Sequence, residues 1–211
     1  MTSKMLKETT EPNTPRSICL YGGTFDPIHL GHTHIAKAAL DRFKFEQVIF
    51  LPCKQSPHKT KERHAAKHHR LAMCKLAITD LDWANVDDFD LNSPEPSYSW
   101  RVVEAMQNQF PGAQLFWLMG SDQWQALHKW NRPDYLAELV EFIVFSRGAT
   151  PIERSGFQMH AIHGAHPASA TIIRENTPGR QQNDWLHPEV LKYIKKHQLY
   201  HDAAKFNKAD D

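Results

Sequence analysis

Four short apolar runs along the chain are each followed by a residue that ends a strand. The runs are Ser17–Tyr21, Gln47–Leu51, Gln114–Met119 and Glu141–Phe145, and glycine, proline or serine follows each of them. Runs of this length and composition are typical of buried strands. A shorter strand is expected near Met159–Ile162.

Between these runs, apolar residues recur every three or four positions, which predicts helices. Strands and helices then alternate, and this order predicts an α/β fold in which a mostly parallel sheet carries helices on both faces. A length of 211 residues suits a single domain of this kind. The predicted helices are Leu30–Arg42, His69–Thr79, Ser99–Gln109, Ser169–Glu175 and Pro188–His197.

Residues that could bind a ligand follow three of the predicted strands. They are Gly22–Thr24, Pro52–Lys59 and Gly120–Asp122. In open α/β sheets, ligands bind beyond the carboxyl ends of the strands. The sequence therefore predicts one ligand site at this edge of the sheet.

Charge and hydropathy exclude some classes of partner. Lys plus Arg number 25 and Asp plus Glu number 24, so no general affinity for nucleic acid or membranes is expected. No apolar run approaches the roughly 18 residues that a membrane span needs, and the N-terminal segment does not look like a signal peptide. We expect a soluble cytoplasmic protein.

The cysteines and the termini complete this description. Cys19, Cys53 and Cys74 are odd in number and far apart, which favours free thiols in a reducing compartment. Residues 1–16 are polar and aperiodic, so we expect a disordered lead, and residues 201–211 are expected to form a flexible tail.

The segment GGTFDPIHLGH, from Gly22 to His32, has the strongest chemical pattern. Two glycines after a strand let the backbone turn sharply and approach a ligand closely. His29 and His32 are three residues apart at a helix start, so they share a face. Backbone N–H groups and a helix N-terminus favour anions. The arrangement suits a polyphosphate.

Other interpretations of the histidine pair stay open at this point. His29 and His32 could simply cap and pack the helix start. A zinc site would need a third ligand, and there is no HExxH motif. The sequence also lacks GxxxxGK[ST] and GxGxxG, which excludes a P-loop and the usual dinucleotide fingerprint.

The segment GGTFDPIHLGH resembles the signature of the HxGH nucleotidyltransferases, and the chain as a whole resembles the bacterial nicotinate mononucleotide adenylyltransferases. The resemblance covers residues 17–200, which we interpret as the nucleotidyltransferase domain. The other matching segments are SPHK (56–59), EPSYS (95–99), GSDQW (120–124), Trp130, SATIIRE (169–175) and LHPEVLKYIKKHQLY (186–200).

This resemblance implies a Rossmann-like domain that converts ATP and nicotinate mononucleotide into nicotinate adenine dinucleotide and pyrophosphate, with Mg²⁺, late in NAD biosynthesis. The attacking phosphate monoester is mostly dianionic at pH 7, because its second pKa is about 6. Positioning and charge stabilisation should then supply most of the catalysis, without a covalent intermediate.

The resemblance also implies roles for single residues. Catalytic contacts with the ATP phosphates fall to His29, His32 and Arg174. Capping by Asp122, Ser169 or Thr171 and core packing by Phe25 are the alternatives, and some could hold together with binding. The residues implied in ATP binding are Gly22, Gly23, Thr24, Phe25, Gly120, Asp122, Ser169 and Thr171.

The pyridine nucleotide is implied to contact His58, Lys59, Ser99 and Trp130. Trp130 is the candidate to stack on the pyridine ring, although a core tryptophan is its alternative. The sequence departs from the family at Trp100-Arg101, where a small or acidic residue and then Thr-Leu are more usual. That difference bears on the pyridine pocket and not on the reaction class.

Several functions remain as alternatives. The same chemistry could use nicotinamide mononucleotide or another phosphate acceptor, and a non-catalytic nucleotide-binding protein would keep the same fold. The basic segment Lys54–Arg70 could bind RNA, but it is interpreted as a solvated loop and helix face. His64 and His68, four residues apart, could bind a metal, but nothing else supports that. A homo-oligomer is also left open.

Overall fold

The computed structural model describes residues 16–54, 64–94, 96–175 and 183–200. Apart from Arg16, the predicted lead and tail lie outside these ranges, so the expected domain bounds stay a prediction. Within the described residues, no helix is both long and apolar enough to cross a membrane.

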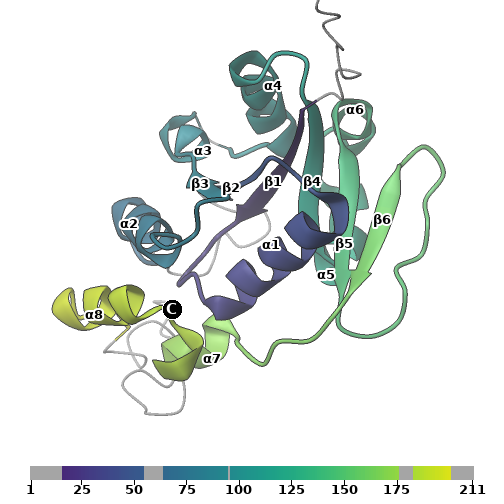
Figure 1. The fold of residues 1–211 in the computed structure, drawn as a ribbon. Coiled ribbons are helices and arrows are strands. Elements are labelled where there is room, and N and C mark those ends of the chain that lie inside the picture. The colour runs from purple at the N-terminus through teal and green to yellow at the C-terminus, as the bar shows by residue number, and fades with distance from the viewer. Residues whose placement is uncertain (1–15, 55–63, 95, 176–182, 201–211) are drawn as a thin grey trace, which may run out of the picture.

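A single six-stranded sheet forms the centre of the fold, in the order β3-β2-β1-β4-β5-β6, and every neighbouring pair is parallel (Figure 1). The strand order reverses between β1 and β4. A doubly wound sheet binds its ligands at such a reversal. The strands are β1 (Ser17–Gly23), β2 (Gln47–Pro52), β3 (Ala84–Val86), β4 (Gln114–Gly120), β5 (Glu141–Ser146) and β6 (Met159–His163).

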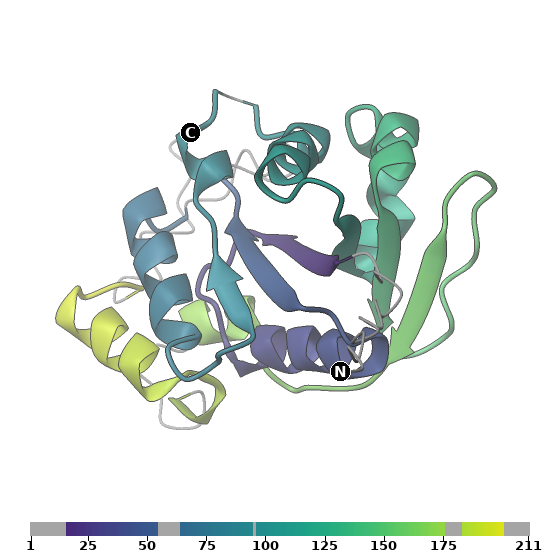
Figure 2. The ribbon, with the colours of Figure 1, turned by 45° about the horizontal axis from the view of Figure 1, so that its top comes forward.

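Helices cover both faces of this sheet, as Figure 2 shows from a second direction. The predicted α/β architecture is therefore confirmed. The described helices are α1 (Leu30–Phe43), α2 (Lys67–Ala77), α3 (Phe89–Asn92), α4 (Ser99–Gln109), α5 (Ser121–Ala126), α6 (Pro133–Leu139), α7 (Ala170–Glu175) and α8 (Pro188–Lys196), with 3-10 turns η1 (Leu127–Lys129) and η2 (Asn183–Trp185).

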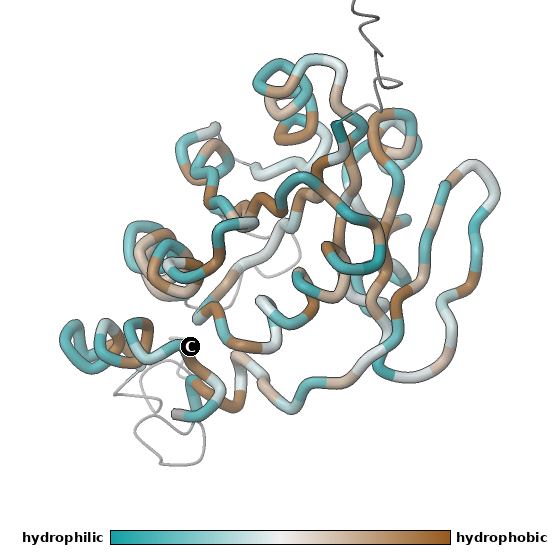
Figure 3. The backbone as a smooth tube through the Cα atoms, in the orientation of Figure 1, coloured by the Kyte–Doolittle hydropathy of each residue, from teal (hydrophilic) through white to brown (hydrophobic). Residues whose placement is uncertain are grey.

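Alternation along the strands builds two apolar layers. Ile18 and Leu20 of β1 face the layer under α4, α5 and α6, whereas Cys19 and Tyr21 face the layer under α1, α2 and α8. Successive side chains of a strand point to opposite faces, and a strand buried on both faces is therefore apolar throughout. Figure 3 shows this as apolar colour along the central strands and polar colour on the outer turns of helices.

Some elements were not predicted because their local patterns are short. Strand β3 has three residues and α3 has four, which is too little for a periodicity to be recognised. Helix α6 begins at Pro133, a favourable first position, but its cap is Arg132 in the left-handed conformation with φ 51°. A positive φ at a non-glycine residue cannot be inferred from a polar sequence.

The paired glycines act differently from the prediction. Strand β1 continues through Gly22 and Gly23, and neither has a positive φ, so they do not make the sharp turn expected of them. A Cβ atom on Gly22 would lie 2.5 Å from Cζ2 of Trp117, and one on Gly23 would lie 2.9 Å from the Phe25 ring. The glycines make room for two aromatic rings, and the left-handed residue is Phe25, with φ 49°.

We predict that Gly22→Ala destabilises the fold by about 1–3 kcal/mol, because the new methyl group overpacks against the buried Trp117 ring. Urea unfolding measures the change. Gly148→Ala is the control, since its Cβ would meet no atom within 4 Å. Combining Gly22→Ala with Trp117→Leu should recover part of the lost stability, and equal loss in Gly22→Ala and Gly148→Ala would contradict the steric explanation.

Candidate active site

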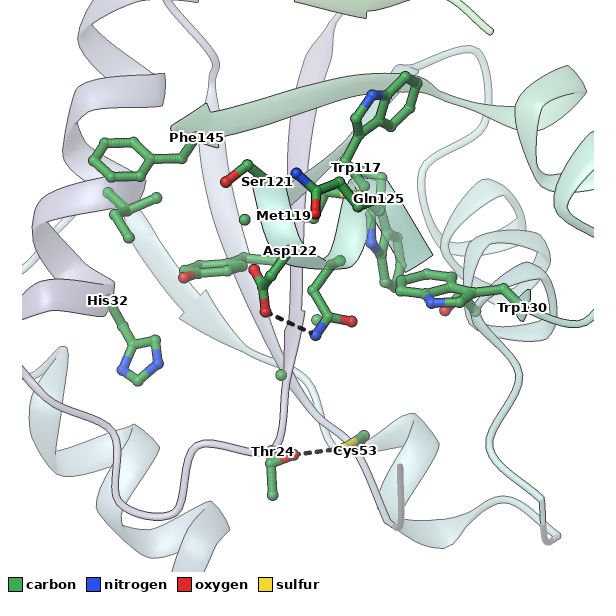
Figure 4. Close-up of a pocket in the computed structure, with 18 of the residues that line it drawn as sticks. Thr24, His32, Cys53, Trp117, Met119, Ser121, Asp122, Gln125, Trp130 and Phe145 are labelled. Atoms are coloured by element: carbon green, nitrogen blue, oxygen red, sulfur yellow. Dashed lines mark hydrogen bonds between the residues drawn. The ribbon is translucent and has the colours of Figure 1, made fainter. Parts of the chain in front are cut away.

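A cavity of about 1330 Å³ opens where β1 and β4 diverge, beyond the carboxyl ends of the strands (Figure 4). The ends of β1, β4 and β5 contribute to its walls, as do the starts of α4, α5 and α7. The cavity therefore lies where the topology predicts a nucleotide, and it is large enough for a ligand with two nucleotide halves.

Most of the residues predicted from the sequence meet in this cavity. Thr171 and Arg174 are not among its lining residues, and Thr171 is exposed. His58 and Lys59 lie outside the described residues. The predicted residues that line the cavity are Gly22, Gly23, Thr24, Phe25, His29, His32, Ser99, Gly120, Asp122, Trp130 and Ser169.

The two motif histidines stack at the start of α1. Their ring centroids are 3.8 Å apart, and His29, the N-cap residue of the helix, is 6% exposed. The backbone N–H of His29 donates to Nδ1 of His32 over 3.1 Å. A neutral His32 therefore carries its proton on Nε2 and can donate from that atom.

Both histidines are held in the neutral form. Burial lowers the pKa of His29 to about 3, and the neighbouring His166 ring and the Arg147 charge act in the same direction. Burial is the largest cause that lowers the pKa of His32 well below its ordinary value. The neighbouring His29, Arg147 and His166 act in the same direction. The exposed Arg147 guanidinium thus adds a positive charge to a site with two neutral imidazoles, which disfavours protonation of either ring and suits an anionic ligand.

Asp122 lies in the first turn of α5, and the N-cap of that helix is Gly120. The interpretation of Asp122 as the N-cap is therefore wrong. Its exposed carboxylate accepts a hydrogen bond from Gln123 Nε2 over 3.3 Å. In the view of Figure 4, Asp122 lies between His32 on one side of the cavity and Trp130 on the other.

The far end of the cavity is aromatic. Ser99 begins α4 there, and Trp130 follows η1 with its ring edge-to-face against Trp117, at a centroid distance of 6.3 Å. Trp130 packs partly on the apolar layer and also lines the cavity, so the core and binding interpretations hold together. Its indole N–H is buried and has no hydrogen-bond partner among the described residues.

Arg174 contacts the motif from behind the cavity. Its Nη1 donates to the backbone carbonyl of Asp26 over 2.6 Å. Ser169 directly precedes α7, and its carbonyl accepts from the N–H of Ile173 over 3.0 Å. The SATIIR segment thus reaches the cavity through Ser169, while its arginine is bonded to the loop that carries His29.

The carboxylate of Asp26 accepts hydrogen bonds from distant segments of the chain. It is 2% exposed and accepts hydrogen bonds from the Tyr200 hydroxyl at 2.6 Å and from the Ala65 N–H at 3.3 Å, and His64 Nδ1 lies 3.1 Å away. Burial raises the pKa of Asp26, but the hydrogen bonds from His64 and Tyr200 outweigh it and leave that pKa below its ordinary value. An aspartate before proline is typical of a turn, so the sequence gives no signal for this role.

Arg70 corrects the interpretation of the basic segment. It is 2% exposed, and its guanidinium donates to the carbonyls of Thr24, Lys54 and Ala65 at 2.7, 3.0 and 3.1 Å. It therefore joins the loops after β1 and β2 and is not a solvated charge. Within a run of lysines, arginines and histidines, no sequence signal marks Arg70 as the buried one.

His64 does not form the suggested metal pair. It precedes α2, which begins at Lys67, and its ring bonds Asp26. Over the described part of the chain, no group of three His, Cys, Asp or Glu side chains is arranged to hold a metal ion.

Comparison with known proteins identifies the class of this chain. Residues 20–176 match the model of the cytidylyltransferase-like family. A probable nicotinate-nucleotide adenylyltransferase of Neisseria meningitidis serogroup B is 35% identical over 199 residues, covering 88% of this chain and 98% of its own length. One from Methylacidiphilum infernorum is 36% identical over 199 residues, covering 93% and 96%.

A solved structure agrees in fold. The nicotinic acid mononucleotide adenylyltransferase of Plasmodium falciparum complexed with NaAD superposes with a TM-score of 0.72 at 22% identity, covering 91% of this chain and 98% of its own. The chain therefore belongs to the cytidylyltransferase-like family and is a nucleotidyltransferase. Within that family it is a member of the nicotinate-nucleotide adenylyltransferases, which confirms the resemblance seen in the motifs.

The depressed pKa values of His29 and His32 predict a loss of stability in acid. The unfolded chain binds protons at these histidines below about pH 6.5, whereas the folded chain does not until near pH 3 for His29. The free energy of unfolding should therefore fall with decreasing pH in this window, by about 1.4 kcal/mol per pH unit for each histidine.

Denaturant unfolding at several pH values tests this. Replacing both histidines with asparagine should flatten the dependence between pH 6.5 and pH 4.5, whereas His128→Gln, at an exposed position, should leave it unchanged. An unchanged slope in the double variant would show that these two rings are not the groups that resist protonation.

Proposed function

We propose that this chain transfers the adenylyl group of ATP directly to the phosphate of nicotinate mononucleotide, with the cavity between β1 and β4 as its active site. Family membership supports the reaction, and the position of the cavity at the strand-order reversal supports the location. The observation that carries the proposal is the stacked pair His29 and His32, which lines one end of that cavity together with the guanidinium of Arg147.

In this proposal the ATP phosphates lie against the histidines. Nε2–H of His32 donates to a phosphate oxygen, and a bound triphosphate would favour protonation of the neighbouring ring by its negative charge. Backbone N–H groups around Gly23 and Thr24, with Ser169, complete the phosphate site. The carboxylate of Asp122, which lines the cavity, is proposed to accept hydrogen bonds from the ribose hydroxyls.

Arg174 keeps its proposed role in the phosphate site, although it is not among the residues that line the cavity. A guanidinium has five N–H donors, so its bond to the Asp26 carbonyl does not exclude a second bond to a phosphate oxygen. Thr171, which is exposed beside it, is proposed to contact the outer phosphates. His58 and Lys59 remain proposed contacts of the pyridine nucleotide.

The transfer needs no nucleophilic side chain. The substrate phosphate is already largely dianionic at pH 7 and attacks the α-phosphorus of ATP in line with the departing pyrophosphate. The residues of the cavity hold the two anions together and stabilise the charge that moves onto pyrophosphate. Nucleotidyltransferases typically use a divalent metal. We infer that the phosphates of ATP would hold Mg²⁺, which would neutralise part of their charge.

The aromatic end is proposed to receive the pyridine ring. Trp130 offers an indole face for stacking, and the start of α4 at Ser99 offers a hydroxyl and backbone donors to a carboxylate. Nicotinamide mononucleotide, which carries an amide in place of the carboxylate, is the closest alternative acceptor. None of these contacts excludes the nicotinamide form by its shape.

The surroundings in which the enzyme works are also proposed. The cysteines Cys19, Cys53 and Cys74 are free thiols, and the first and last are buried, which suits a reducing cytoplasm. A net charge of +1 supports small-molecule partners over nucleic acid. A homo-oligomer remains a prediction.

Pyrophosphate release tests the acceptor. Purified protein with ATP and Mg²⁺ should release pyrophosphate with nicotinate mononucleotide and at least about tenfold more slowly with the nicotinamide form, since one charge-assisted hydrogen bond is lost. Equal rates would show that the pocket does not recognise the carboxylate. No release with either nucleotide would refute the proposed reaction.

His32→Ala tests the phosphate site. We expect kcat to fall by about 10²–10³-fold, as for the loss of one preorganised donor, while the fold is retained. Steady-state kinetics and the urea midpoint measure the two effects separately. His128→Ala removes an exposed histidine that does not line the cavity and serves as the control. A near-normal rate in His32→Ala would remove this residue from the mechanism.

A further inference from the structure

A hydrogen bond joins the two walls at the aromatic end of the cavity. Nε1–H of Trp100, in the first turn of α4, donates to Oδ1 of Asn131 over 2.8 Å. Trp100 directly follows Ser99, and Asn131 directly follows Trp130. The bond therefore connects the immediate neighbours of the two residues assigned to the pyridine nucleotide.

A guanidinium strengthens this connection. Cζ of Arg132 lies 4.9 Å from the centroid of the Trp100 ring and 4.1 Å from that of Tyr135 on α6. Both distances are within the range of cation–π attraction. Arg132 holds this position as the left-handed cap of α6, a conformation that costs free energy for a residue with a Cβ atom. The surrounding contacts must offset that cost.

A second guanidinium, that of Arg101, also packs against the Trp100 ring. Cζ of Arg101 lies 5.1 Å from the Trp100 ring and 4.7 Å from the Tyr98 ring, and the Tyr98 and Trp100 rings are nearly parallel, at 16°. Tyr98 itself lines the cavity. The start of α4 and the turn before α6 are thus held by alternating aromatic rings and guanidinium groups.

Trp100 lies outside the set of cavity-lining residues, whereas its neighbours Tyr98, Ser99, Trp130 and Asn131 line the cavity. The outer face of both walls is therefore fixed by a residue that does not touch the ligand site. Loss of Trp100 would free the turn that carries Trp130 to move away from Ser99, and it would leave the other end of the cavity, at His29, as it is.

We propose that Trp100 is a positioning residue that fixes the spacing between Ser99 and Trp130 and so determines the affinity for the pyridine nucleotide. This inference rests on the proposed function, because it takes that end of the cavity to be the pyridine site. It requires that loss of Trp100 weaken the binding of nicotinate mononucleotide and not that of ATP. A purely structural role would weaken the binding of both substrates or of neither.

Calorimetric titration with nicotinate mononucleotide and steady-state kinetics with both substrates test the proposal. Trp100→Ala should raise Kd and KM for nicotinate mononucleotide about tenfold, the equivalent of one good hydrogen bond, and leave KM for ATP within about twofold. Trp100→Phe, which keeps a ring but loses the N–H, should give a smaller increase. Because Trp100 acts through Asn131, Trp100→Phe should add little to Asn131→Ala.

Trp83→Ala is the matched control. Trp83 is also half-buried but packs on the opposite apolar layer and does not line the cavity. It should lower stability without a selective change in KM. An equal increase of KM for both substrates in Trp100→Ala would overturn the proposal. An increase of KM for nicotinate mononucleotide alone in Trp83→Ala would also overturn it.

The binding measurement separates this inference from the proposed function. If the wild type binds nicotinate mononucleotide but releases no pyrophosphate, the proposed reaction fails, and the comparison of Kd between wild type and Trp100→Ala still decides the positioning role. If the wild type does not bind this nucleotide at all, both are refuted.

Discussion

The buried carboxylate of Asp26 is the interaction on which the phosphate end of the site depends. A carboxylate with so little exposure must have its charge compensated by hydrogen bonds. The bonds come from Tyr200 near the C-terminus and from the segment of His64 and Ala65 before α2, and Arg174 holds the carbonyl of the same residue. Three distant parts of the chain therefore fix the loop that presents His29.

The two ends of the cavity differ in the groups that line them. At the phosphate end, two buried histidines stay neutral and offer hydrogen bonds, and the exposed Arg147 supplies positive charge without the desolvation cost of a buried cation. At the other end, Trp130 packs edge-to-face on Trp117, and the bond from Trp100 to Asn131 joins the two walls of the cavity. Because strand order reverses between β1 and β4, one parallel sheet can bring both ends to a single edge.

A feature of the fold or the site can be predicted from the sequence when it arises from residues that are neighbours in the chain. Every strand except β3, most of the longer helices and the meeting of the Gly22–His32 segment with Asp122 at one edge follow from periodicity and topology. The burial of Arg70, the partners of Asp26 and the left-handed Arg132 could not be predicted, because each depends on contacts between segments far apart in the chain. Gly22 shows the same limit, since its role is set by the Trp117 ring on β4.

In the proposed reaction, this cavity catalyses transfer by positioning two anions for one direct displacement. The stereochemical course of the reaction, followed with ATP that carries a single-configuration sulfur substitution at the α-phosphorus, tests this mechanism. One in-line displacement inverts the configuration at phosphorus, and we predict inversion in the dinucleotide product. Retention would require two displacements and a covalent adenylyl-enzyme, and it would refute direct transfer.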